Sequence, residues 1–360
     1  MRCAQCVMLD RVPGSDFDEN GVCRWCRAGY PDYRPLGIDR LRALIAEKRR
    51  PDSEVDCVVG ISGGKDSSFA VWAMRKHFGL RVEAFTYEHS GSSPLARDNA
   101  RAVCASLGVN LTVTSLGPEV HLKAFRDYFT AWLDRPSTVT AGMICVACKH
   151  LHVVGCELAA RKRAPLVVWA KCPLEDSPFL ALKNTGEGTR REGLIKGSAL
   201  LAGEMLKSRR LLTAIGHQFP MSVQGCLAFA PSSPYLKWRY PSVEQISLFE
   251  YWPWSPTEIY RTLNEETGWR KPDDCASDWH SDCIFNVFKE YVFQSMLGAS
   301  YTDGFLSNQI RAGLLSRDQA LAELLESKRH FARILPEALQ RVGLGDYADR
   351  VDASCFSVAE

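Results

Sequence analysis

The chain has 360 residues, of which 46% are hydrophobic and 24% are charged, and its 44 basic side chains nearly balance 42 acidic ones. This composition excludes a disordered or fibrous protein and predicts a globular chain of two or three domains. No apolar run approaches the roughly 18 residues of a membrane span, and the N-terminus lacks the apolar region of a signal peptide. We therefore expect a cytoplasmic protein with no membrane partner. In that reducing compartment, 14 cysteines favour metal binding or catalysis over disulfides.

Two pairs of cysteines stand near the N-terminus. Cys3 and Cys6 form one CxxC pair, and Cys23 and Cys26 form another after sixteen intervening residues. Each pair can present two thiolates from one tight turn, and four thiolates complete the tetrahedral coordination of Zn²⁺. Such a closed site leaves no open position for chemistry. We therefore predict a zinc ribbon over residues 1–35 that stabilises the fold or holds a partner, rather than four unrelated buried cysteines.

The predicted elements after the ribbon alternate between helices and strands. In chain order they are a helix at 38–49, a strand at 55–61, a helix ending near Gly79, a strand at 80–87, a helix at 94–107, and strands at 109–115 and 165–170. This alternation is typical of an α/β fold with a parallel, doubly wound sheet, which we assign to residues 36–240. Residues 241–360 are expected to form a helical region that binds substrate or a partner.

Local signals place several helix ends. Ser93-Pro94 is a good cap and first-turn pair, and the runs Ser255–Glu258 and Ser316–Gln319 are capping-box patterns. Gly268 and Gly298 stand where helices could end. These signals predict that the chain is mainly helical from residue 255 onward.

A glycine-rich loop follows the first predicted strand and opens a helix. Its six residues are Ser62, Gly63, Gly64, Lys65, Asp66 and Ser67. The two glycines let backbone amides approach a phosphate, the serines add hydroxyl donors, and the lysine adds a cation. Asp66 stands where a Walker A loop would carry Ser or Thr. A carboxylate beside a phosphate cradle is suited to holding Mg²⁺ or orienting a pyrophosphate leaving group, so we interpret the loop as functional rather than as a chance turn.

This loop resembles the PP-loop of the ATP pyrophosphatases, which use Ser-Gly-Gly-x-Asp-Ser after the first strand. The resemblance implies a HUP-like fold, the cofactors ATP and Mg²⁺, and adenylation of a carbonyl or amide oxygen, after which a nucleophile displaces AMP. Lys65 and Asp66 would be catalytic. The implied ATP contacts are the loop itself with Ile61, Ser68, Tyr87 and His89. For His89, a catalytic base and a hydrogen-bonded structural histidine are equally supported.

Further landmarks narrow the resemblance. In order, they are the N-terminal CxxC, Asp18–Cys26, SGGKDS, Ile144–Cys148, Trp252-x-Trp254 and His280–Cys283. Together they are similar to the N-acetyl sugar amidotransferase family of lipopolysaccharide biosynthesis, over residues 3 to about 290. The resemblance implies conversion of the acetamido group of a nucleotide-linked sugar to an acetamidino group, with ammonia from a glutaminase partner.

A second set of cysteines points to another chemistry. Cys145 and Cys148 form a CxxC pair between predicted helices, and Cys172 follows the last predicted strand. Open α/β sheets bind ligands at the carboxyl ends of their strands, so Cys172 is expected to face the ATP site and to be catalytic with the pair. With Cys172, Cys226 or Cys283 as a third ligand, the pair could hold a [4Fe-4S] cluster or relay a persulfide. Burial as small hydrophobic side chains is the alternative for Cys172 and Cys226.

These cysteines keep a second function open, which is sulfur insertion into a nucleobase, a tRNA or a small metabolite. Its partner would be a cysteine desulfurase or another sulfur donor. Lys171 and Cys172 stand where the similar amidotransferases tend to carry acidic and amide residues, and this difference favours sulfur. A third hypothesis, a non-catalytic ATP-binding scaffold, is disfavoured by the intact loop.

The stretch 183–210 is locally basic, with seven basic and three acidic side chains. It suits an anionic substrate such as a nucleotide sugar or a nucleotide, and RNA is not excluded; a solvated loop is the alternative. Aromatic residues at 235–254 could stack on a base or sugar, but packing in the core explains most of them more simply.

Overall fold

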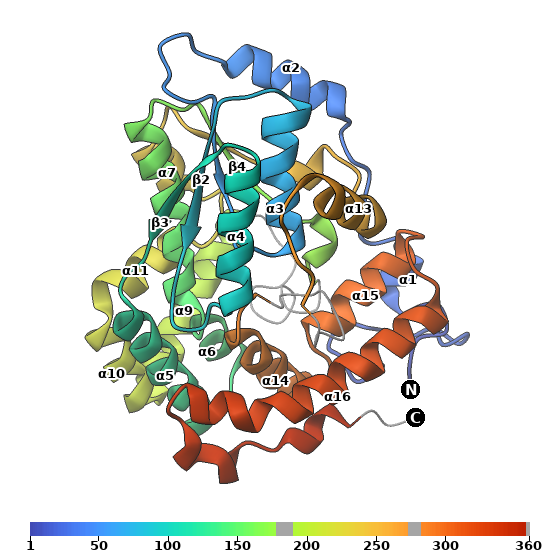
Figure 1. Ribbon diagram of the computed structural model, residues 1–360. Helices are drawn as coiled ribbons and strands as arrows, with labels where there is room; N and C mark the ends of the chain where they lie inside the picture. The colour runs from blue at the N-terminus through green and yellow to red at the C-terminus, as the bar shows by residue number, and fades with distance from the viewer. Residues whose placement is uncertain (178–189, 273–281, 358–360) are drawn as a thin grey trace.

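The computed structural model describes residues 1–177, 190–272 and 282–357 (Figure 1). Its centre is a five-stranded parallel sheet in the order β3-β2-β1-β4-β5. The strands are β1 (Cys57–Gly60), β2 (Val82–Tyr87), β3 (Asn110–Thr114), β4 (Leu166–Trp169) and β5 (Glu244–Ser247). Because later strands add on both sides of β1, the sheet is doubly wound, which confirms the expected α/β fold class.

The helices surround this sheet. They are α1 (Arg24–Arg27), α2 (Ile38–Lys48), α3 (Lys65–Trp72), α4 (Pro94–Ser106), α5 (Pro118–Asp134), α6 (Thr138–Met143), α7 (His150–Arg161), α9 (Arg190–Lys207), α10 (Arg209–His217), α11 (Phe219–Leu227), α12 (Pro234–Arg239), α13 (Pro256–Glu266), α14 (Phe285–Leu297), α15 (Tyr301–Arg311) and α16 (Arg317–Arg341). Short helical turns are η1 (Ala73–His77), η2 (Val146–Lys149), η3 (Pro173–Glu175), η4 (Leu248–Glu250), η5 (Gly345–Arg350) and η6 (Ala353–Phe356).

Alternation along the central strands builds a core on each face of the sheet. Val59 and Val168 face the core that includes residues of α3 and α4, whereas Val58 and Val167 face the core that includes residues of α7. All four are buried, as expected for strands covered on both faces. A third core joins the N-terminal cysteines to α5, α14 and α16. These helices lie beyond the carboxyl edge of the sheet in Figure 1.

Most of the local signals act where they were expected. The Ser93 side chain accepts a hydrogen bond from Ala96 N at the start of α4, and Ser316 forms a capping box with Gln319 at the start of α16. Gly298 ends α14 with φ +72°. Gly268 does not cap α13, because Thr267 already follows the last helical residue, Glu266.

The helical C-terminal region is present, but it begins with a strand. β5 pairs in parallel with β4, so the sheet extends into the segment after residue 240. β5 has only four residues, and Ile246 is the one buried residue among them. Its apolar alternation is therefore too short to be recognised in the sequence. Across the described ranges, no helix has the length and apolar character needed to cross a membrane.

Candidate active site

The glycine loop lies between β1 and α3, and its shape requires glycine at position 63. Gly63 has φ +86°, and a Cβ there would lie 1.8 Å from the carbonyl oxygen of Ala96. The loop is closed by Ser67, whose Oγ accepts a hydrogen bond from Ser62 N at 3.1 Å and lies 3.0 Å from Ser62 Oγ. Helix α3 begins immediately after Gly64, so its N-terminus faces the loop.

Lys65 and Asp66 are held by a tryptophan from a distant part of the chain. Lys65 Nζ donates to Asp66 Oδ2 at 2.9 Å, and Trp254 Nε1 donates to Asp66 Oδ1 at 2.9 Å. Lys65 is buried and also lies 5.5 Å from the Trp254 ring centroid. Both oxygens of Asp66 are therefore engaged. Trp254 belongs to the tryptophan landmark in the sequence, but its contact with the loop aspartate was not foreseen.

Glu175 is a second carboxylate at this site that sequence reasoning missed. It lies just beyond β4, and its Oε1 accepts a hydrogen bond from Cys172 N at 3.0 Å. Burial, reinforced by the nearby negative charge of Asp66, raises the pKa of Glu175 to about 7. The positive charges of Lys171 and Lys65 lower the pKa of Glu175, but they do not offset the effect of burial. The site therefore contains a carboxyl group that titrates near neutral pH.

Cys172 lies beside the glycine loop, as its position after β4 suggested. Its thiol is 1% exposed, and its charged neighbours are Glu175, Asp66 and Lys65. Burial raises the pKa of this thiol well above its usual range. A protonated, enclosed thiol is a poor nucleophile, so this environment suits packing better than sulfur chemistry.

Three other cysteines gather into a group that we call the cysteine trio, formed by Cys145, Cys148 and Cys283. A hydrogen bond from Cys148, assisted by Lys289 and Lys149, lowers the pKa of Cys145 to about 7 despite burial. Cys283 interacts electrostatically with both members of the pair, and burial raises its pKa to about 12. The trio therefore combines one readily ionised thiol with nearby positive charge.

Cys226 lies on α11 and has a different neighbour. Its Sγ is 3.9 Å from the sulfur of Met143, and burial raises its pKa. Of the three candidates for a third cysteine beside the CxxC pair, Cys283 interacts electrostatically with the pair, whereas Cys172 interacts with Asp66 and Lys65 of the loop. Of the His280–Cys283 landmark, His280 and Ser281 lie outside the described residues.

Two stacked histidines adjoin the trio. The rings of His89 and His121 lie 4.3 Å apart, and His121 Nε2 is 3.2 Å from Cys148 Sγ. Burial lowers the pKa of His89 to about 4 and, together with His89, that of His121 to about 3. Both rings are therefore neutral at physiological pH. His121 lies on α5 in no motif, so nothing in the sequence singled it out.

These histidines and Cys148 are close enough to share a metal ion, with ligand atoms within 4.8 Å of one another. However, His89 Nδ1 accepts a hydrogen bond from Gly91 N at 3.1 Å. Accepting at Nδ1 puts the proton of a neutral imidazole on Nε2, which is then not free to bind a metal. The bonding of His89 therefore fits a structural histidine better than a metal ligand, whereas Nδ1 of the stacked His121 is buried without a hydrogen-bond partner among the described residues.

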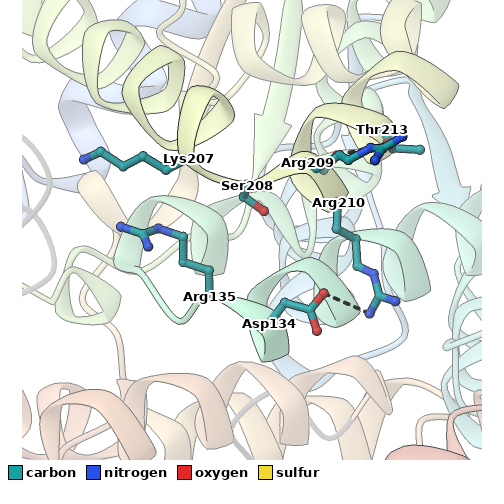
Figure 2. A pocket seen from close by; sticks show the side chains of 7 residues that line it. All are labelled: Asp134, Arg135, Lys207, Ser208, Arg209, Arg210 and Thr213. Atoms are coloured by element: carbon teal, nitrogen blue, oxygen red, sulfur yellow. Dashed lines mark hydrogen bonds and ion pairs between the residues drawn. The ribbon is translucent and has the colours of Figure 1, made fainter.

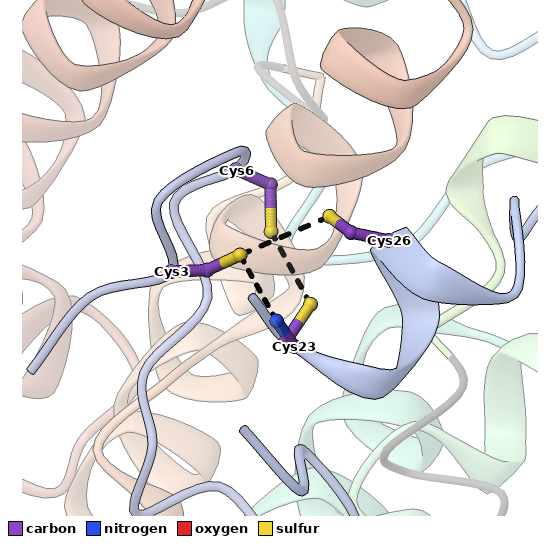
Figure 3. Close-up of side chains that lie close together, drawn as sticks. All are labelled: Cys3, Cys6, Cys23 and Cys26. Atoms are coloured by element: carbon purple, nitrogen blue, oxygen red, sulfur yellow. Dashed lines mark hydrogen bonds between the residues drawn. The ribbon is translucent and has the colours of Figure 1, made fainter. Parts of the chain in front are cut away.

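The four N-terminal cysteines converge as expected (Figure 3). The sulfur atoms of Cys3 and Cys26 are 3.9 Å apart, those of Cys6 and Cys23 are 3.7 Å apart, and all four lie within 4.8 Å of one another. Tetrahedral zinc with Zn–S bonds of about 2.3 Å requires sulfurs about 3.8 Å apart, so this group fits Zn²⁺.

An arginine connects the ribbon to the turn that follows β4. Arg311 Nη1 lies 3.3 Å from Cys6 Sγ, and Arg311 Nη2 donates to Asn308 Oδ1 at 2.5 Å. Asn308 Nδ2 in turn donates to the carbonyl oxygen of Leu174 at 2.7 Å, next to Glu175. A guanidinium beside thiolates also offsets part of the negative charge that four cysteines bring to a divalent ion.

The end of the basic segment, from Lys207 to Arg210, lines a pocket together with the end of α5 (Figure 2). The pocket, of about 540 Å³, is lined by Asp134, Arg135, Lys207, Ser208, Arg209, Arg210 and Thr213. Asp134 pairs with Arg210, and Glu204 pairs with Arg135, so the basic lining is only partly neutralised. The pocket adjoins the end of α5 opposite His121, about 20 Å along the helix. Residues 183–189 of the basic segment lie outside the described residues.

Comparisons with known proteins give weak likenesses. No protein-family model matches the chain, and no curated protein does. The solved NH3-dependent NAD synthetase of Campylobacter jejuni subsp. jejuni, in complex with nitrate, aligns with 45% of this chain and 71% of its own at 17% identity, with a TM-score of 0.28. The U34-tRNA thiolase of Methanococcus maripaludis, with its [4Fe-4S] cluster, aligns with 87% of this chain and 86% of its own at 14% identity, with a TM-score of 0.36. Neither likeness decides the activity of this chain.

The ribbon geometry predicts one tightly bound zinc per chain. Replacing Cys23 by Ser should remove the zinc and lower the melting temperature, because three ligands cannot close a tetrahedral site. Elemental analysis measures the zinc content of the wild type and the variant, and thermal unfolding measures their melting temperatures. Cys57→Ala is the control, since Cys57 is buried in the sheet core and should leave the zinc content unchanged. Full zinc content in Cys23→Ser would contradict the assignment.

The environment of Glu175 predicts a pH-dependent stability. Its pKa is raised from 4.5 to about 7 on folding, so the native state favours the protonated form. The stabilisation from this group is complete below about pH 4.5 and is lost as the pH rises toward 7, by at most roughly 1.4 kcal/mol per pH unit. Glu175→Gln should remove this dependence.

Urea unfolding at several pH values between 4.5 and 8 measures the effect. Relative to the wild type, the Glu175→Gln variant should gain stability as the pH rises through this window and show no further gain above it. Glu337→Gln, at an exposed position on α16, is the matched control and should run parallel to the wild type. Parallel curves for Glu175→Gln would show that the carboxyl group is not perturbed.

Proposed function

We propose that this chain is an ATP-dependent adenylating enzyme of the PP-loop type. The observation that carries the proposal is the glycine loop between β1 and α3, with a buried lysine and a firmly oriented aspartate at the start of the helix. Loop amides and a helix N-terminus form a phosphate-binding cradle. Their position at the carboxyl end of the central strand is where open α/β sheets bind ligands.

The chemistry proceeds in two displacements. A carbonyl or amide oxygen of the substrate attacks the α-phosphorus of ATP, and pyrophosphate leaves. Lys65 and the loop amides stabilise the negative charge on the departing phosphates, and Mg²⁺ supplies further positive charge when bound. Each oxygen of Asp66 accepts one hydrogen bond and keeps a second lone pair, so this aspartate orients Lys65 and would still have a lone pair for the metal. A nucleophile then attacks the activated carbon, and AMP leaves with the oxygen.

The electrostatic coupling of the three trio cysteines supports sulfur as that nucleophile. Cys145, Cys148 and Cys283 would hold an iron–sulfur cluster through three thiolates, and such a cluster supplies a site for sulfide when bound. Lys289 and Lys149 help to lower the pKa of Cys145, whereas the pKa values of Cys148 and Cys283 are raised, so Cys145 is the thiol of the trio that ionises most readily. Attack by sulfide on the adenylated carbon forms the C–S bond and releases AMP, so the substrate oxygen is exchanged for sulfur. A cysteine desulfurase or similar donor would supply the sulfur as a persulfide, and a thiol reductant would release it as sulfide by providing two electrons and forming a disulfide.

Amidotransfer is the second candidate, and the order of the sequence landmarks favours it. In the fold, the tryptophan landmark reaches Asp66 through Trp254, and the Asp282-Cys283 landmark adjoins Ser62 and the trio. Residues that mark the N-acetyl sugar amidotransferase resemblance thus surround the proposed ATP site. In this version ammonia from a glutaminase subunit displaces AMP, and the substrate is an N-acetylated nucleotide sugar of lipopolysaccharide biosynthesis.

The basic pocket bears on the substrate in either version. The pocket lies roughly 20 Å along α5 from His121, so a substrate that reached both would have to be extended, as an RNA is. The basic lining of the pocket therefore supports an extended anionic substrate for sulfur insertion.

Substitution of the charged loop residues tests the adenylation step. Lys65→Ala and Asp66→Ala should each reduce pyrophosphate release from ATP by about 100-fold or more, because charge stabilisation at the leaving group is lost. A coupled pyrophosphate assay on the purified chain measures this, with circular dichroism to confirm folding. Lys76→Ala, an exposed position beyond α3, is the control. Unchanged release in both loop variants would refute adenylation.

Metal analysis after anaerobic purification distinguishes sulfur insertion from amidotransfer. Sulfur insertion predicts iron and acid-labile sulfide that are lost in Cys145→Ser and Cys283→Ser but kept in Cys226→Ser and Cys172→Ser. The reason is that only the first two remove a trio ligand, whereas Cys226 lies by Met143 and Cys172 by the loop. Zinc without iron in the wild type would favour amidotransfer instead. Equal loss of iron in all four variants would contradict the trio as its binding site.

A further inference from the structure

Helix α11 lies at the outer edge of the molecule in Figure 1 and presents a row of exposed apolar side chains. Phe219, Val223 and Leu227 follow one another at intervals of four residues, so they lie on one side of the helix, and they are 59%, 40% and 48% exposed. Phe229, two residues beyond the helix, is 52% exposed. We call these four residues the apolar ridge. Single exposed apolar residues are ordinary on a protein surface, whereas a row of them is typical of a binding surface.

Another side of α11 packs on the turn that carries the CxxC pair. A Cβ placed on Gly225 would lie 2.6 Å from the carbonyl oxygen of Val146, which stands between the two cysteines of the pair. Gln224 Oε1 is 2.6 Å from Nδ1 of His150, at the start of the helix that follows this turn. The apolar ridge and the CxxC turn are therefore separated by no more than the width of one helix, about 10 Å.

The ridge ends beside the CxxC pair. The ring centroid of Phe229 lies 4.5 Å from Nζ of Lys149, and Lys149 directly follows Cys148 in the chain. Both cysteines of the pair, Cys145 and Cys148, are partly exposed. A protein seated on the ridge would therefore lie next to two thiols of the cysteine trio.

The surface around the ridge is basic. Residues 205–243 contain five lysines and arginines and no aspartate or glutamate. On α12, which packs against α11, Lys237 and Arg239 are exposed on either side of Trp238, which is 76% exposed. Interfaces pair groups of opposite charge, so the occupant of this surface has to offer acidic side chains together with apolar ones.

Three other occupants suit the ridge less well. A second copy in a two-fold dimer would place the same basic residues against each other. Nucleic acid would gain little from Val223 and Leu227, because aliphatic side chains offer neither an aromatic face for stacking nor a hydrogen bond. An anionic membrane would match the charge, but nothing in the proposed chemistry places it beside the CxxC turn. A protein with an acidic border fits both the charge and the position.

We propose that the apolar ridge is the docking surface for the cysteine desulfurase that delivers sulfur to this site. The inference rests on sulfur insertion as the proposed function. The partner presents an apolar surface bordered by aspartate and glutamate, and docking brings its persulfide next to the CxxC pair. Docking itself changes no covalent bond. The terminal sulfur of the persulfide then leaves as sulfide, because a thiol reductant supplies two electrons and becomes a disulfide.

Binding of a fluorescently labelled cysteine desulfurase from the same organism to the full chain, with any metals it carries, tests the docking surface. Val223→Glu and Leu227→Glu should each weaken binding roughly tenfold or more, because a carboxylate replaces an apolar contact and repels the acidic border. Val113→Glu is the matched control, since Val113 is a 48% exposed valine on β3, outside the ridge. Circular dichroism confirms that the variants fold.

Photocrosslinking gives a second readout that locates the contact. A benzoylphenylalanine in place of Val223 should crosslink to the desulfurase, whereas one in place of Val113 should not. The charges predict that binding weakens as the salt concentration rises from about 0.1 M to about 0.5 M, and that this dependence decreases in the double variant Lys237→Glu, Arg239→Glu.

Pyrophosphate release distinguishes failure of the docking surface from failure of the proposed function. The ridge variants should release pyrophosphate as the wild type does, because the ridge lies outside the glycine loop. Absence of desulfurase binding in the wild type, or equal binding by the ridge variants, would overturn the docking surface. The same holds if these variants lose binding of a glutaminase, a transfer RNA, phosphatidylglycerol vesicles or a second copy instead. Absence of pyrophosphate release in the wild type would refute adenylation, whatever the ridge binds.

Discussion

The close approach of α4 to the glycine loop is the constraint on which the site depends. Where Gly63 passes the carbonyl of Ala96, there is no room for a side chain. The carbonyl oxygen of Gly63 is taken by Trp269 Nε1 at 2.9 Å, with Asn99 Nδ2 at 3.4 Å. Groups outside the loop thus satisfy the outward-facing backbone. Within the loop, Ser62 N and Gly64 N donate to the loop serines, so contacts from both sides fix its shape, and a fixed shape is what preorganised anion binding requires.

The two cysteine groups illustrate opposite uses of the same side chain. The four ribbon cysteines face one another at spacings that zinc would close completely, and they pack with α14 and α16 in a shared core. The trio lies at the carboxyl edge of the sheet, beside neutral histidines and two lysines. Positive charge near a partly exposed thiol lowers the cost of ionisation, whereas closure by four ligands removes reactivity. The environment of each sulfur atom, rather than the CxxC motif, decides whether a cysteine suits a structural or a reactive role.

Much of the fold could be predicted from the sequence because its signals are local. The β-branched run before the loop, the Ser93-Pro94 start of α4 and the capping box at Ser316 each depend on residues within one turn or one strand. The glycine loop and the ribbon cysteines are likewise short, regular patterns. In contrast, β5 is short and weakly alternating, and its place in the sheet depends on pairing with β4, which lies 78 residues earlier in register.

The composition of the candidate site was harder to predict, because it depends on contacts between distant segments. Trp254 reaches Asp66 across 188 residues, and His121 reaches Cys148 across 27. Nothing in the sequence distinguishes Glu175 from the other acidic residues, because its raised pKa results from burial beside Asp66 in the fold. The choice of Cys283 over Cys172 and Cys226 as the neighbour of the CxxC pair follows from how α14 packs at the sheet edge. No spacing rule in the sequence encodes such convergence.

The contact between Arg311 and the ribbon gives the zinc group a mechanical role. Arg311 links Cys6 to Asn308, and Asn308 holds the turn that carries Glu175. The ribbon is thus linked to the turn of Glu175 through side chains rather than along the backbone. A cysteine group with no open coordination position still bears on the candidate site, because it braces this turn. Loss of the ribbon thiols would therefore loosen the turn as well as the ribbon.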